Sequence, residues 1–158
     1  MKNAWLSIQK LHGQFVAAVS NLQSPFLFLF VRLYWGWEFM EDGWGKLHNL
    51  ARVTEYFTSL GLPAPGQTAL FVSIIELVGG ALLVIGLFSR LTALVLTVNM
   101  VVAFVAGDRD ALLSIFSDPD KFSNAAPYMF LFASLVILIF GPGKISLDAL
   151  LGRYARRP

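Results

Sequence analysis

The chain has 158 residues, of which 56% are hydrophobic and 14% charged, with a mean hydropathy of +0.66. That hydropathy lies well above the value of an ordinary soluble domain, so much of the apolar surface is expected to face lipid. The formal net charge of +2 gives no indication of a nucleic-acid partner, and without cysteine any redox chemistry would need a cofactor or a partner protein.

The N-terminal segment has the pattern of an amphipathic helix. Apolar residues recur at spacings of three and four between residues 3 and 22, and polar residues occupy the rest of the helix surface. This predicts a helix over residues 1–23 that lies in the membrane interface. The polar run Leu11-His12-Gly13-Gln14 argues against a cleaved secretory signal.

A first transmembrane span is expected over about residues 25–40. Ser24-Pro25 opens it, phenylalanine and leucine fill its first half, and tyrosine and tryptophan follow at the level expected for lipid headgroups. Gly43 and Gly45 are expected to break this helix. A second amphipathic pattern over residues 47–60 then predicts a helix on the outer side of the membrane.

Three further apolar runs predict spans at about residues 67–88, 91–106 and 125–140. The chain is therefore predicted to be all-α, a bundle of four transmembrane helices with a membrane domain over residues 24–148 and a basic tail over 149–158. The alternative is a buried helix bundle of a soluble protein. It is disfavoured because four such runs leave too little polar surface.

Positive charges outside the predicted spans are distributed unequally between the two membrane faces. Seven lysines and arginines, Arg90 and Lys144 among them, fall on the side of the chain ends, against four on the other side. Positive residues concentrate in cytoplasmic loops. Both termini are therefore expected to be cytoplasmic, with the chain in the inner membrane of a bacterium.

Three ionisable residues, Arg32, Glu38 and Glu76, lie within predicted spans, where charge is costly. Counting residues from the ends of the spans places Arg32 and Glu76 near mid-membrane and Asn99 in the same layer. These three residues, with Trp35 and Glu38 nearer the outer mouth, form the candidate ligand-binding site. A buried Arg32–Glu76 ion pair that only sets helix register is the competing interpretation, and the sequence does not separate the two.

An acidic and aromatic cluster follows the first span. Its charged members are Glu38, Glu41, Asp42 and Lys46, and its tryptophans are Trp35, Trp37 and Trp44. Such a cluster could frame an entrance for a cation or a quinone, or it could be a hydrated rim. His12 and His48 are expected on opposite membrane faces, so no metal site is predicted.

Several motifs occur in a characteristic order along residues 26–148, and through them the sequence resembles the DoxX family of small bacterial membrane proteins. These motifs are Arg32, Gly43, Lys46-Leu47, Leu60-Gly61-Leu62-Pro63, Glu76-Leu77-Val78-Gly79-Gly80, Gly86-Leu87, Ser89-Arg90 and Gly141-Pro142-Gly143-Lys144-Ile145-Ser146-Leu147-Asp148. Family members often carry a His-Gly pair before the lysine, whereas this chain has Asp42-Gly43.

The resemblance implies a four-helix membrane fold and association with redox enzymes. Some relatives are subunits of thiosulfate:quinone oxidoreductase, and others are membrane partners of soluble oxidoreductases in thiol-stress defence. The leading hypothesis is a membrane subunit that binds a quinone or a similar small apolar ligand. Whether the chain is itself an enzyme stays open, and no catalytic residue is assigned.

The alternative hypothesis is a non-catalytic anchor or assembly partner. Such a protein would dock a soluble oxidoreductase through its basic C-terminal segment, residues 146–157, and its N-terminal helix. A small transporter is disfavoured because no span shows the broken-helix pattern. Faces rich in small residues would permit homo-oligomers.

Overall fold

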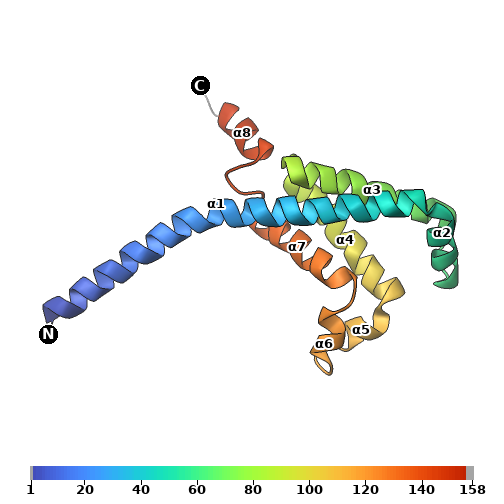
Figure 1. Ribbon diagram of the computed structural model, residues 1–158, viewed down its shortest axis with the longest axis horizontal. Helices are drawn as coiled ribbons and strands as arrows, with labels where there is room; N and C mark the ends of the chain where they lie inside the picture. The colour runs from blue at the N-terminus through green and yellow to red at the C-terminus, as the bar shows by residue number, and fades with distance from the viewer. Residues whose placement is uncertain (1, 156–158) are drawn as a thin grey trace.

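Helix is the only regular secondary structure in residues 2–155, the part of the chain that the computed structural model describes. Before residue 26 it describes the side chains of Lys10 and Gln14 only. The elements in chain order are α1 (Lys2–His48), α2 (Leu50–Ser59), α3 (Pro65–Ile85), α4 (Ser89–Gly107), α5 (Arg109–Leu113), α6 (Pro119–Ser123), α7 (Pro127–Phe140) and α8 (Leu147–Tyr154) (Figure 1).

The first helix, α1, runs from Lys2 to His48 without interruption. The helix ends expected at Ser24-Pro25 and at Gly43 are therefore wrong. A proline inside a helix removes one backbone hydrogen bond and commonly bends the helix instead of ending it. Figure 1 shows α1 changing direction along its length, with its N-terminal part extending away from the other helices. The amphipathic pattern over residues 1–23 lies almost entirely outside the described side chains.

Glycines bring α1 into direct backbone contact with α3, and this explains why Gly43 is helical. A Cβ on Gly36 would lie 3.0 Å from the Gly80 carbonyl oxygen, and one on Gly43 would lie 2.7 Å from that of Ser73. Small residues of this kind allow two helices to approach closely. The pairs also show that the helices are antiparallel, with residue 36 beside residue 80 and residue 43 beside residue 73.

Two helices, α3 and α4, are long and apolar enough to cross a membrane, with mean hydropathies of 2.3 and 1.8. The expected tight hairpin joins them, and its turn is at residues 86–88, where Gly86 has a φ of 73°. The apolar helix α7 is shorter, and the expected first span is part of α1. Each of α1 and α4 packs against both α3 and α7.

Polar and small residues share the buried faces of α3 and α4 with the apolar core, and large apolar residues cover the exposed faces. On α3 the buried residues include Ser73, Glu76 and Gly79, whereas Phe71 and Val78 are exposed. Leucines and valines are likewise exposed along α4. A lipid-facing surface has this composition, because hydrocarbon covers apolar side chains and polar groups turn toward the protein interior.

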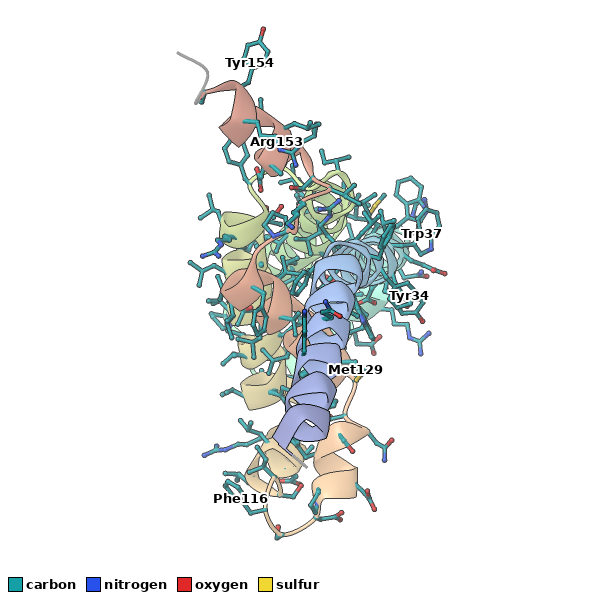
Figure 2. All side chains as sticks on the ribbon, turned by 90° about the vertical axis from the view of Figure 1, so that its left-hand side faces the viewer. Tyr34, Trp37, Phe116, Met129, Arg153 and Tyr154 are labelled. Atoms are coloured by element: carbon teal, nitrogen blue, oxygen red, sulfur yellow. The ribbon has the colours of Figure 1, made fainter. Side chains whose placement is uncertain are left out.

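The short helices lie at the periphery. A helix is present where the second amphipathic pattern predicted one, as α2, and the expected polar loop contains α5 and α6. The basic tail begins as α8, where the hydroxyl of Ser146 accepts a hydrogen bond from the backbone N–H of Ala149. In Figure 2, Arg153 and Tyr154 lie at one extreme of the molecule and Phe116, between α5 and α6, at the other.

Candidate functional site

The buried carboxylate of Glu76 is the point where side chains from three helices meet. It lies in the middle of α3 and is 1% exposed. Lys46 of α1 donates from Nζ to Oε2 at 2.5 Å, and Asn99 of α4 donates from Nδ2 to Oε1 at 2.9 Å. Each carboxylate oxygen therefore has a hydrogen-bond donor, as a buried charged group requires.

Lys46 connects this buried carboxylate to a more exposed one. Its ammonium also donates to Asp42 Oδ2 at 2.9 Å, one helical turn earlier on α1, and the Asp42 side chain is 43% exposed. Two carboxylates thus share one ammonium group. We refer to Asp42, Lys46, Glu76 and Asn99 as the Glu76 cluster.

The Glu76 cluster lines a cavity of about 910 Å³. Residues of α1, α2, α3 and α4 and the first turn of α7 surround it, and its apolar walls include Phe57, Met100 and Phe130. A cavity of this size with mainly apolar walls and a few converging polar groups is typical of small-molecule sites.

The structure brings some of the predicted site residues together. Asn99 does share a layer with Glu76, and the two are hydrogen bonded. Glu38 lines the cavity. Trp35 is not among the lining residues, but its ring packs edge-on against Phe130 with centroids 5.3 Å apart, and Phe130 does line the cavity.

Arg32 lies elsewhere: among the described residues it neither joins the layer of Glu76 and Asn99 nor forms the alternative ion pair with Glu76. The side chain is 2% exposed and donates to the carbonyl oxygens of Pro142 at 2.9 Å and Val84 at 3.4 Å. Gly86 makes room for it, since a Cβ there would lie 2.7 Å from Arg32 Nη1. Arg32 therefore ties α1 to the end of α3 and to the segment after α7.

The register between α1 and α3 explains this error. Contact between Gly36 and Gly80 places Arg32, four residues earlier on α1, beside Val84. Val84 lies eight residues beyond Glu76, which is about 12 Å along a helix. Depth counted from an assumed start of the first span could not detect this offset.

Lys46 is the site residue that the sequence-based prediction placed at the mouth and not beside Glu76. Its spacing of four from Asp42 is the spacing of neighbours on a helix, and that signal was available. It was overridden because Gly43 and Gly45 were expected to end the helix first. Since α1 continues to His48, Lys46 lies on the face that packs against α3.

The Glu76 cluster offers hydrogen-bond donors and carboxylate acceptors beside an apolar space. This combination suits a small molecule with a polar oxygen-bearing head and an apolar body. Within the described residues, no group of three or more histidine, cysteine, aspartate or glutamate side chains could hold a metal ion.

The chain is similar to a known family and to two individual proteins. The family model described as DoxX matches residues 27–109, which include Lys46, Glu76 and Asn99. The chain is 30% identical over 122 residues to "Inner membrane protein YqjF" of Escherichia coli (strain K12), covering 73% of this chain and 84% of that protein. It is 32% identical over 139 residues to an uncharacterized protein of Haemophilus influenzae, covering 82% and 96% respectively. No solved structure matches.

Proposed function

The chain belongs to the DoxX family of membrane proteins, and from this premise we propose that it is an inner-membrane subunit of a redox system that binds a quinone or a similar small apolar molecule. The observation that carries the proposal is the position of the buried Glu76 cluster on the wall of a cavity of about 910 Å³.

The burial of the Lys46–Glu76 pair favours a functional role. An ionisable residue at mid-membrane costs about 2.5–3.5 kcal/mol on insertion scales, and such residues commonly mark ligand or proton pathways. A pair that only sets helix register is the competing explanation. The register between α1 and α3, however, is already set by their glycine contacts. A pair with a purely structural role also does not explain the cavity beside it.

The free hydrogen-bonding capacity of the cluster indicates the class of ligand. A lysine ammonium has three N–H donors, and Lys46 uses two of them on Asp42 and Glu76. The third can be donated to a carbonyl oxygen such as that of a quinone. Phe57 and Phe130 offer ring surfaces for stacking. Glu76 can exchange the proton that a quinol oxygen gains or loses.

The ligand would reach the cavity from one side of the membrane. With both termini cytoplasmic, α2 and the end of α4 lie on the outer side, and both line the cavity. The ligand would then enter from the outer half of the membrane, past Asp42, and reach Glu76 with its polar head.

Quinone binding to the purified chain in lipid nanodiscs tests this proposal. Native mass spectrometry and solvent extraction count bound quinone, and titration with a short-chain quinone quenches tryptophan fluorescence. Glu76→Gln and Lys46→Met should each weaken binding by about tenfold or more, because each removes a charge-assisted hydrogen bond. Glu55→Gln is the matched control, since Glu55 is exposed on α2 and outside the cavity.

Unchanged quinone affinity in correctly folded Glu76→Gln would show that the proposed role of the cluster is wrong. A wild-type chain that carries lipid only, and that co-purifies with a soluble oxidoreductase, would instead favour a non-catalytic anchor.

A further inference from the structure

A second cavity, of about 520 Å³, lies where α1, α4, α7 and α8 come together. Three basic side chains, those of Arg90, Lys144 and Arg153, line it together with one acidic side chain, that of Asp148. It shares no lining residue with the cavity beside Glu76. We refer to it as the basic pocket.

The single carboxylate of the basic pocket is already engaged. Asp148 accepts hydrogen bonds from the backbone N–H groups of Phe88 and Ser89, both at 2.8 Å, at the start of α4. Its charge is therefore stabilised by the N-terminus of that helix. Within the described part of the chain, Arg90, Lys144 and Arg153 form no ion pair.

The backbone after α7 holds Arg90 at the pocket. Gly141 has a φ of +82°, and a Cβ there would lie 3.3 Å from Arg90 Nε. The guanidinium also makes a long hydrogen bond of 3.4 Å from Nη2 to the carbonyl oxygen of Ile139. This one protein contact leaves most of its N–H donors free to bind an anion.

The other wall of the basic pocket is aromatic and continues onto an exposed apolar surface. Phe28 and Phe140 both line the pocket and stack with ring centroids 5.8 Å apart. Phe140 is 63% exposed on the outside of the helices. The pocket thus combines anion-binding groups with an apolar surface at one end of the membrane-crossing helices, where Arg153 of α8 is also found (Figure 2).

We propose that the basic pocket binds the phosphate of an anionic phospholipid, with the acyl chains lying against Phe28 and Phe140. Arginine and lysine form charge-assisted hydrogen bonds to phosphate oxygens, and basic pockets at helix ends are typical sites for anionic headgroups. A bound lipid would fasten α8 and the segment after α7 to the membrane surface. This inference is independent of the ligand proposed for the Glu76 cavity.

Lipid titration followed by native mass spectrometry tests the inference. The delipidated chain in detergent is titrated with phosphatidylglycerol and, separately, with phosphatidylcholine of the same acyl chains. The wild type should prefer phosphatidylglycerol. Arg90→Gln combined with Arg153→Gln should lower that preference by roughly 25-fold, at about fivefold for each basic residue removed. Arg109→Gln combined with Lys121→Gln removes the same charge outside the pocket and should leave the preference unchanged.

Three results would overturn the inference. The first is a wild-type chain without preference for the anionic lipid, and the second is an unchanged preference in the pocket variant. The third is inorganic phosphate that binds as tightly as the lipid, which would assign the pocket to a free anion. Loss of a co-purifying soluble protein in the pocket variant, with no change in lipid binding, would assign the surface to a protein partner.

Discussion

Two buried charged residues, Glu76 and Arg32, lie about two helical turns apart along α3 and have different surroundings. Glu76 has a charged partner and an amide, and a large cavity adjoins it. Among the residues that the structure describes, the hydrogen-bond partners of Arg32 are backbone carbonyl oxygens, and its side chain lies against Gly86. A buried charge in a membrane helix therefore does not by itself mark a site. Space for a ligand distinguishes the two residues, since Glu76 lines a cavity and Arg32 does not.

The two residues differ because arginine only donates hydrogen bonds, whereas a carboxylate only accepts them. Arginine has five N–H donors, and two carbonyl groups from segments far apart in the sequence accept from it, so it joins parts of the chain. The carboxylate of Glu76 needs donors, and the lysine that supplies one keeps an unused N–H. Arg32 also keeps unused N–H groups, its Nε among them, but it lines neither cavity, whereas the unused N–H of Lys46 adjoins one.

The largest effect is expected from Gly43→Ala, because the contact between α1 and α3 positions both residues. The new methyl group would meet the backbone of Ser73 and Leu77, which cannot move aside as a side chain can. The free energy of unfolding in detergent should fall by about 3 kcal/mol or more. Gly45→Ala is the matched control, since nothing lies within 4 Å of its Cβ position. Equal stability of the two variants would contradict the proposed packing.

Arg32→Met should separate structure from binding. The carbonyl groups of Pro142 and Val84 lose their donor while the bulk of the side chain is largely kept. The free energy of unfolding should fall by about 2 kcal/mol, with quinone affinity unchanged. Denaturation and quinone titration of one preparation measure both quantities. A stable Arg32→Met variant that no longer binds quinone would show that Arg32 takes part in ligand binding, as Glu76 is proposed to do.

The smallest effect is expected from Asp42→Asn. The Asp42 side chain is 43% exposed, and solvent-screened pairs contribute about 0–1 kcal/mol. Quinone affinity should fall by no more than about threefold, far less than in Glu76→Gln. The comparison is made by fluorescence titration of the two variants in one experiment. If Asp42→Asn weakened binding as much as Glu76→Gln, the polar head of the ligand would lie at the mouth of the cavity.

Prediction from the sequence succeeded for features that depend on hydropathy and residue counts within individual helices. The apolar runs of α3 and α4, their hairpin, and the common depth of Glu76 and Asn99 all follow from hydropathy and from residue counts within two adjacent helices. Membership of the DoxX family, predicted from ordered motifs, is confirmed by the family model and by both relatives.

Prediction failed where the interpretation depended on how α1 meets α3. Glycine was read as a signal for the end of a helix, a local rule that holds when the next residues leave the helix. In this fold Gly36 and Gly43 are contact residues, and backbone atoms of α3 occupy the space that a side chain would fill. Proline at position 25 was misread in a similar way, since α1 continues through it.

The sequence alone determined that the chain is helical, belongs in a membrane and contains polar groups at mid-span, because hydropathy and the cost of burying charge act residue by residue. The tertiary structure decided which of those groups meet. Two glycine contacts, Gly36 with Gly80 and Gly43 with Ser73, join residues 44 and 30 positions apart. They set the register that brings Lys46 to Glu76 and keeps Arg32 away. Register is a property of two surfaces in contact, and no single segment of the sequence contains it.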